Sequence, residues 1–348
     1  MEKQRNNYLD FLRGLAAINI IVIHTCFWSG ESYVPTIVKS LSLLLDVPFF
    51  FFLAGWSRSY SPTFKRTIHS LIDLYGKYVF FITCYFIFLI LQQQTGGVNN
   101  YLAYISFVNL EPTKFFVLMG SIWFMPVYFT VVPFCMLVIN GINKSGNDIR
   151  RLQKQFILIC FILFIWNQSG MGYLFLSREM LFYSVFFLLG YLLKDTKIKS
   201  VKVFLIIEVL LISSAIVLAK LMEVDIVNIQ SLKFPPHIIY MIFSILAITM
   251  ALFFKERAYP SKSNFFVWAG KNAIWFYFAQ GIASTVIYKL VESLQYVWYI
   301  KLPICIIVNI CLTIMIVCII KWLYSYVEKV CVTVLKNRGI DKLPCKQK

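Results

Sequence analysis

Ten mostly apolar stretches, each about as long as a bilayer is thick, follow one another along this chain. An α-helix rises about 1.5 Å per residue, so roughly 20 apolar residues cross the hydrocarbon core of a membrane. By this rule the sequence predicts membrane-spanning helices at residues 9–28, 36–57, 77–92, 115–139, 155–170, 179–193, 201–222, 236–254, 265–288 and 302–326. The expected fold is therefore all-α, a polytopic membrane bundle of about ten transmembrane helices.

The composition agrees with a membrane protein and excludes several other classes. The 348 residues are 59% hydrophobic and 14% charged, whereas a soluble globular chain has about 25% charged residues. This excludes a soluble globular protein, a disordered chain and a secreted disulfide scaffold. The net charge of +17 resembles that of a nucleic-acid binder. However, lysines and arginines cluster between the apolar stretches, which is typical of cytoplasmic membrane loops, so no nucleic-acid partner is expected.

The positions of the cations also predict the orientation of the bundle. If the N-terminus is inside, most of the 33 lysines and arginines fall on the same side of the membrane as the N-terminus. Such an excess marks the cytoplasmic side, so both termini are expected in the cytoplasm. We expect residues 1–327 to form one transmembrane domain with an uncleaved first helix. Residues 328–348 are expected to form a short basic tail along the inner leaflet, with no additional extracellular domain.

The nine cysteines do not indicate a disulfide framework or a metal site. Most lie within the apolar stretches, and no two are spaced as C-x-x-C. A buried cysteine usually behaves as a small hydrophobic residue. We therefore expect the cysteines to be packing residues and expect no bound metal.

The first predicted helix carries three ionisable residues, Asp10, Arg13 and His24. Charged groups inside a bilayer are costly and commonly mark function. The steps from Arg13 to His24 make about three helical turns, so both side chains lie on one face, roughly 16 Å apart along the axis. Asp10 lies one turn before Arg13, a spacing that suits an ion pair. Histidine transfers protons near neutral pH, so His24 is a candidate general base. The alternative is an interfacial ion pair followed by an ordinary core histidine.

Other ionisable residues near the membrane are less informative. Asp46 falls in the middle of the second predicted helix, where a lone carboxylate needs a partner. It either orients His24 or forms a hydrogen bond between helices. His69 lies in a basic loop, where a solvated position is expected. His237 follows two prolines at the start of a helix, where capping is favoured over catalysis.

The segment after the second predicted helix is expected to be a basic cytoplasmic loop. Its cations are Arg58, Lys65 and Arg66. Cations of this kind can hold phosphates through charge-assisted hydrogen bonds. They are equally consistent with the ordinary excess of positive charge in cytoplasmic loops.

On the outer side, an aromatic stretch and two adjacent charged residues stand out. The aromatic stretch runs from Trp123 to Tyr128, and Arg178 and Glu179 begin the sixth predicted helix. Aromatic side chains at an outer membrane face suit stacking on sugars. An interfacial aromatic belt is the commoner explanation for such residues.

Five motifs along the chain resemble those of the membrane-bound acyltransferase-3 family. Residues 8–17 (YLDFLRGLAA) followed by His24 resemble its first helix, whose signature is an arginine, ten residues and a histidine. The other motifs are PFFFFLAGWS at 48–57, SIWFMP at 121–126, FFLLGYL at 186–192 with Arg178, and GKN at 270–272 with Tyr277. The resemblance covers nearly the whole chain. One departure is Gln280, because many members have a histidine after the tyrosine of the ninth helix.

The resemblance implies an integral membrane O-acyltransferase, usually an O-acetyltransferase. Its donor is cytoplasmic acyl-CoA, a co-substrate rather than a permanently bound cofactor, with its phosphates near Arg13 and the basic segment 58–66. Asp10 and Arg13 then bind donor phosphate or hold the entrance open. His24 removes the proton of the acceptor hydroxyl, either directly or through an acyl-histidine relay.

The same resemblance bears on acceptor and location. It implies an acceptor on an envelope or surface glycan or a lipid-linked saccharide, and a multi-pass protein of a bacterial cytoplasmic membrane. Self-association in the bilayer stays open. The main alternative function is a proton-coupled transporter or flippase of a lipid-linked glycan or small solute, because Asp46 and His24 lie within predicted spans. The sequence shows no internal symmetry of the kind common in transporters. A structural or sensory membrane protein is a third possibility.

Overall fold

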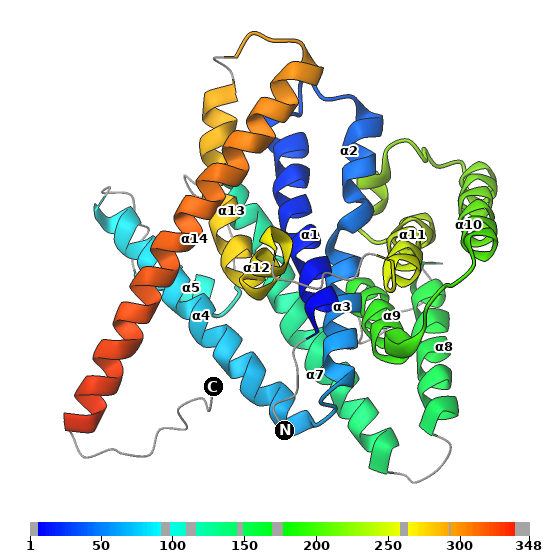
Figure 1. Ribbon diagram of the computed structural model, residues 1–348, viewed down its shortest axis with the longest axis horizontal. Helices are drawn as coiled ribbons and strands as arrows, with labels where there is room; N and C mark the ends of the chain where they lie inside the picture. Colours follow the sequence, from blue (N-terminus) through cyan, green and yellow to red (C-terminus); the bar gives the residue numbers. More distant parts are fainter. Residues whose placement is uncertain are drawn as a thin grey trace.

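The computed structural model describes residues 6–91, 98–108, 116–144, 149–168, 177–257, 264–291 and 294–337. These ranges contain helices and turns and no strand, which confirms the all-α prediction (Figure 1). The helices are α1 (Asn7–His24), η1 (Thr25–Ser29), α2 (Thr36–Ser42), η2 (Leu43–Leu45), α3 (Val47–Ser59), α4 (Phe64–Leu91), α5 (Val98–Ile105), α6 (Phe116–Ser121), α7 (Phe124–Lys144), α8 (Ile149–Gln168), α9 (Arg178–Leu192), η3 (Leu193–Asp195), α10 (Val201–Leu221), η4 (Ile229–Leu232), α11 (Ile238–Phe254), α12 (Phe265–Lys271), α13 (Ala273–Leu290) and α14 (Trp298–Asn337).

Among the described residues, six helical segments are long and apolar enough to cross a membrane. They are Asn7–Ser29, Thr36–Ser59, Phe64–Leu91, Phe124–Lys144, Val201–Leu221 and Trp298–Thr333. The helix α11 is apolar but shorter. The remaining predicted spans coincide with α8, α9 and α12–α13, which are shorter or less apolar. The architecture is that of a multi-pass membrane protein, while the count of ten spans and the sides of the termini stay predictions.

The second predicted span is not one continuous helix, contrary to the sequence-based expectation. It consists of α2, the 3-10 turn η2 and α3, with Asp46 in an extended conformation between η2 and α3. Pro48 lies in the first turn of α3, where a missing N–H costs nothing. The side chain of Asn19 in α1 donates to the carbonyls of Ser42 at 2.7 Å and Leu45 at 3.2 Å. A neighbouring helix therefore supplies the hydrogen bonds that the break leaves open.

Two helices continue beyond the apolar stretches from which their spans were predicted. The helix α4 begins at Phe64 rather than at residue 77, so the expected basic loop is only a short turn between α3 and α4. The helix α14 continues to Asn337, well into the predicted tail. Hydropathy predicts only the part of a helix that lies in lipid. The helix itself continues for as long as its backbone hydrogen bonds continue, here into polar residues. Residues 338–348 of the predicted tail lie outside the described residues.

The helix α1 lies at the centre of the bundle (Figure 1). It contributes to two large buried apolar clusters. One joins α1 to α3, α7, α8, α9 and α11, and the other joins α1 to α4, α13 and α14. In contrast, only 6% of the apolar part of α10 is buried, and this helix packs at the margin against α11. The charged face of α1 is thus enclosed by helices on both sides.

Two pairs of helices approach each other closely enough to need glycine. The helix α1 packs on α12 through Gly14 and Gly270, and α3 packs on α9 through Gly55 and Gly190. A Cβ atom added to any of these four glycines would lie 1.7–1.8 Å from a backbone carbonyl oxygen of the partner helix. These crossings fix α1 and α3, the two helices that carry His24 and Asp46 at their ends.

Candidate functional site

A cavity of about 220 Å³ runs beside α1 in the middle of the bundle. Arg13 and His24 both line it, which confirms that the two side chains face the same way. Because they lie about three turns apart, roughly 16 Å along the helix axis, the cavity is long and narrow. Its walls come from α1, α3, α7 and α13, from the break at Asp46 and from the turn before α11.

At one end of the cavity, Arg13 forms the predicted ion pair with Asp10. The distance between Arg13 Nη1 and Asp10 Oδ1 is 3.2 Å. Asp10 is buried, whereas the Arg13 side chain is one quarter exposed. Asp10 itself does not line the cavity. Its carboxylate holds the arginine at the mouth, with part of the guanidinium accessible to an anion.

His24 is the last residue of α1, and the chain then widens into the π-helical turn η1. Such turns are rare and often occur at functional sites. His24 Nδ1 is buried and has no hydrogen-bonding partner among the described residues. Gln280 of α13 lies beside the imidazole and also lines the cavity.

Asp46 has the buried partner that the sequence led us to expect. Its Oδ2 atom accepts from Lys233 Nζ at 2.7 Å and from the Tyr240 hydroxyl at 2.7 Å. Its Oδ1 atom is buried and without a partner among the described residues. The hydrogen bonds of Asp46 therefore go to Lys233 and Tyr240 rather than to His24, although both Asp46 and His24 line the cavity.

Lys233 is the residue that sequence reasoning missed. It lies between the predicted spans 201–222 and 236–254, where a lysine is ordinarily a solvated loop residue, but it is only 6% exposed and lines the cavity. Its ammonium group lies 5.5 Å from the ring centre of Trp123 and 5.2 Å from that of Phe234. The available signal was indirect, because a carboxylate within a span demands a partner and Asp46 had none nearby in sequence.

The predicted aromatic residues form a wall of this cavity. Trp123 and Tyr128 both line it, together with Phe50, Phe124 and Tyr277. Trp123 also makes an edge contact with Phe234, with 4.9 Å between ring centres. These rings therefore face the interior of the bundle rather than forming a belt at the membrane surface.

The other predicted cations lie outside the cavity. Arg58 donates to the hydroxyl of Ser70 at 2.8 Å, and Arg66 donates to that of Ser61 at 2.6 Å. Lys65 is exposed in the first turn of α4. These three residues are not brought together with His24 in the structure.

Arg178 and Glu179 are also outside the cavity. Arg178 donates to the backbone carbonyl of Asn167 at 2.9 Å and so ties α9 to α8. Glu179 lies in the first turn of α9, where a negative charge favours the helix N-terminus. The geometry therefore gives both residues structural contacts.

The two remaining histidines behave largely as the sequence indicated. His237 caps α11, since its Nδ1 atom accepts from the N–H of Ile239 at 3.2 Å, which confirms the capping interpretation. Burial of His237, together with the nearby charge of Arg178, lowers its pKa. His69 is exposed as expected, but it lies on the helix α4 rather than in a loop.

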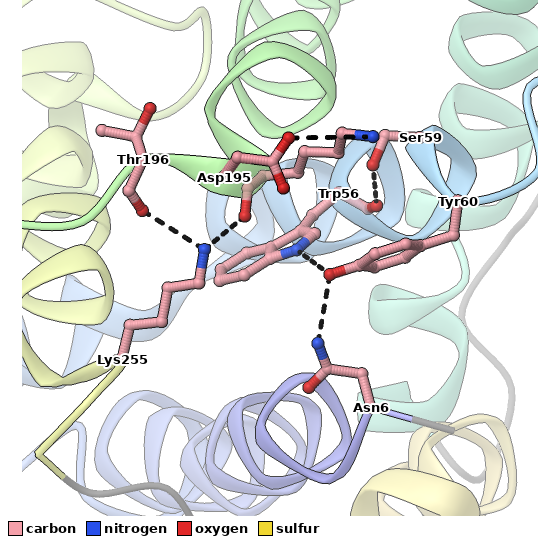
Figure 2. A network of polar contacts seen from close by, with 8 residues as sticks. Asn6, Trp56, Ser59, Tyr60, Asp195, Thr196 and Lys255 are labelled. Carbon is pink, nitrogen blue, oxygen red and sulfur yellow. Dashed lines mark hydrogen bonds and ion pairs between the residues drawn. The ribbon is translucent and has the colours of Figure 1, made fainter. Parts of the chain in front are cut away.

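A network of polar contacts ties together the helix ends near the start of α1 (Figure 2). The hydroxyl of Tyr60 accepts from both Trp56 and Asn6 at 3.1 Å. The ammonium group of Lys255 lies 4.8 Å from the ring centre of Trp56 and donates to the carbonyl of Thr196 at 3.3 Å. This network joins the ends of α1, α3 and α11 to the segment after η3.

Metal ligands do not cluster in the part of the chain that the structure describes. No group of three or more histidine, cysteine or acidic side chains is close enough there to hold a metal ion. The eight cysteines within those ranges are unpaired. The ionisable and hydrogen-bonding side chains that line the cavity include those of Arg13, His24, Asp46, Ser121, Tyr128, Lys233, Tyr277 and Gln280.

Comparison with known proteins gives one match. No curated protein and no solved structure matches this chain. A family model for the acyltransferase domain of acyltransferase family 3 matches residues 6–323, which includes both ends of the cavity. Because this match covers most of the 348 residues, the chain belongs to the acyltransferase-3 family of membrane acyltransferases.

Proposed function

We propose that this protein is an O-acetyltransferase that moves an acetyl group from acetyl-CoA to a hydroxyl of an envelope or surface glycan, with His24 as general base. One observation carries the proposal: Arg13 and His24, about three helical turns apart on α1, line the same cavity. A donor with a phosphate-rich head and a thin reactive arm fits this arrangement.

The donor end is the mouth at Arg13. The Arg13 guanidinium is partly exposed beside Asp10 and suits charge-assisted hydrogen bonds to phosphate. The basic residues Arg58, Lys65 and Arg66 supply further positive charge for the nucleotide, outside the cavity. The unbranched pantetheine arm then runs along α1 and brings the thioester to His24.

At the other end, His24 removes the proton of the acceptor hydroxyl. The hydroxyl oxygen attacks the thioester carbonyl, the carbon–sulfur bond breaks, and coenzyme A leaves as a thiol with the proton from the imidazolium. General-base catalysis of this kind contributes roughly 10²–10⁴-fold to the rate. An acyl-histidine relay is the variant in which the imidazole first accepts the acetyl group.

The acceptor end offers groups that suit a sugar. Trp123 and Tyr128 present aromatic surface to the cavity, and the Oδ1 atom of Asp46 is available to accept a hydrogen bond from a hydroxyl group. Sugars pack their C–H faces on aromatic rings, and their hydroxyl groups donate hydrogen bonds to carboxylates. The acceptor is therefore a glycan or a lipid-linked saccharide that enters opposite Arg13. The proposal includes a location in a bacterial cytoplasmic membrane, with Arg13 toward the cytoplasm.

The test is transfer of label from [¹⁴C]acetyl-CoA to envelope glycan in membranes that hold matched amounts of each variant. Wild-type membranes should label the glycan, and His24→Ala membranes should not. The control is His69→Ala, since His69 is exposed on α4 away from the cavity, and this variant should keep wild-type transfer. Label that persists in His24→Ala membranes, or its absence from every fraction of wild-type membranes, overturns the proposal.

A further inference from the structure

Lys233 brings a positive charge into the cavity that the mechanism above does not use. Its side chain is 8% exposed, and it forms an ion pair with Asp46 at 2.7 Å. Lysine is almost never buried unless it is paired. The pair joins the turn before α11 to the break between η2 and α3, and both residues line the cavity that His24 also lines.

The ammonium group has hydrogen-bonding capacity to spare. A lysine carries three N–H donors, and among the described residues the only acceptor bonded to Lys233 Nζ is Asp46 Oδ2. The rings of Trp123 and Phe234 flank the group at 5.5 and 5.2 Å and offer no oxygen acceptor. Two donors are therefore available to a molecule in the cavity.

The position of this donor is fixed before any substrate binds. Asp46 is held by Tyr240 as well as by Lys233, and its own side chain is 1% exposed. Asp46, Lys233 and His24 all line this cavity, and the charges of Asp46 and Lys233 both act on the His24 imidazole. A fixed donor in a largely apolar site stabilises developing charge far better than a mobile donor in water.

We propose that Lys233 stabilises the oxyanion formed during acyl transfer and is a catalytic residue of this protein. This inference rests on the proposed function. As the acceptor oxygen bonds to the thioester carbon, the carbonyl electron pair moves to the carbonyl oxygen, and Lys233 donates a hydrogen bond to that negative oxygen. The pair returns when the carbon–sulfur bond breaks, and coenzyme A leaves with the proton that His24 took. Asp46 and Tyr240 are positioning residues that hold Lys233.

The alternative is a purely structural ion pair, and the variants are chosen to separate the two. Lys233→Met alone leaves a buried carboxylate without its cation, which destabilises a fold strongly. The double variant Lys233→Met/Asp46→Asn removes both charges and keeps an acceptor for Tyr240. The control is Lys220→Met, because Lys220 is an exposed lysine at the end of α10, outside the cavity.

The experiment measures release of free coenzyme A thiol by full-length protein in native membranes, with saturating acetyl-CoA or chloroacetyl-CoA. Loss of an oxyanion donor typically lowers kcat by about 10²–10³-fold, and we expect this loss with acetyl-CoA for the double variant. Chloroacetyl-CoA has a more electrophilic carbonyl and should lose less. Binding of coenzyme A should stay within about twofold of wild type, and Lys220→Met should match wild type in all three measurements.

Two results would overturn the assignment to Lys233. One is a double variant with near-wild-type turnover. The other is an equal loss with both donors, as expected if the cavity has merely collapsed. The His24→Ala membranes separate the two proposals. If these membranes still transfer label, the proposed function is wrong. If His24→Ala is inactive but the Lys233 double variant stays active, only the role given to Lys233 is wrong.

Discussion

Gly14 of α1 and Gly270 of α12 face each other so closely that neither can carry a side chain. A Cβ atom on Gly14 would lie 1.8 Å from the carbonyl oxygen of Phe266, and one on Gly270 would lie 1.7 Å from that of Asp10. The second pair, Gly55 and Gly190, repeats this arrangement between α3 and α9. These four glycines lie in or directly after the motifs that resemble the family, so part of that resemblance reflects how the cavity walls are held.

The first prediction concerns this packing. Gly55→Ala places a methyl group 1.8 Å from the backbone oxygen of Phe187, so α3 and α9 must separate. Overpacking of this kind costs about 1–3 kcal/mol. We expect a lower Tm in detergent. The Tm is measured by heating samples and then quantifying the protein that still elutes as a monodisperse peak, by its fluorescence in size-exclusion chromatography.

The matched control for that prediction is Gly141→Ala in α7. A Cβ atom at Gly141 meets nothing within 4 Å, and alanine is favoured over glycine in a helix by up to about 1 kcal/mol. The Tm of this variant should equal or exceed that of wild type. A Gly55→Ala protein as stable as Gly141→Ala would contradict the role given to the crossing.

The second prediction concerns the mouth of the cavity. The double variant Arg13→Gln/Asp10→Asn removes the cation without leaving a buried carboxylate unpaired. A hydrogen bond to a charged group contributes about 1.5–3 kcal/mol, so KM for acetyl-CoA should rise roughly 10–100-fold. The kcat should change little, because Arg13 lies about three turns from His24.

Label transfer at several acetyl-CoA concentrations checks this second prediction. Lys329→Ala is the control, since Lys329 is an exposed cation near the end of α14. A fall in kcat with an unchanged KM would show that Arg13 acts on the chemical step instead of the donor.

The third prediction concerns pH and His237. Burial and the charge of Arg178 lower the pKa of His237 below its usual value of about 6.5. The folded state therefore favours the neutral ring. The resulting contribution to the free energy of unfolding is fully present above the pKa that His237 has in the unfolded chain. It is lost progressively as the pH falls through 6.5 toward the lowered folded pKa.

Replacing His237 with asparagine tests this dependence. Asparagine is a good N-cap residue, so His237→Asn should keep the cap on α11 while removing the titrating group. As the pH is lowered from about 8 to about 5, the Tm of the variant should fall less steeply than the Tm of wild type. If the Tm of both proteins falls equally with pH, groups other than His237 cause the loss of stability in acid.

Features that depend on one helix could be read from the sequence. The ion pair between Asp10 and Arg13 and the shared face of Arg13 and His24 follow from helical spacing alone, and the structure confirms both. The cap formed by His237 is likewise local. In each case the interacting groups lie within a few turns, so the periodicity of the chain suffices.

Features that depend on distant segments could not be read in this way. The need of Asp46 for a partner was evident, but Lys233 lies far along the chain and resembles any loop lysine. The break before α3 was also missed, because hydropathy stays high through it. Pro48 was the available signal, since proline favours the first turn of a helix over its interior.

The break between η2 and α3 has an electrostatic consequence for the cavity. Peptide dipoles give a helix a partial positive charge at its N-terminus and a partial negative charge at its C-terminus. An unbroken second helix would have exposed these ends only at the two membrane surfaces. Because α3 begins at Val47, which lines the cavity, its positive end lies at the same depth as the Asp46 carboxylate. The backbone itself thus sets up a field across the interior of the bundle, where the cavity lies.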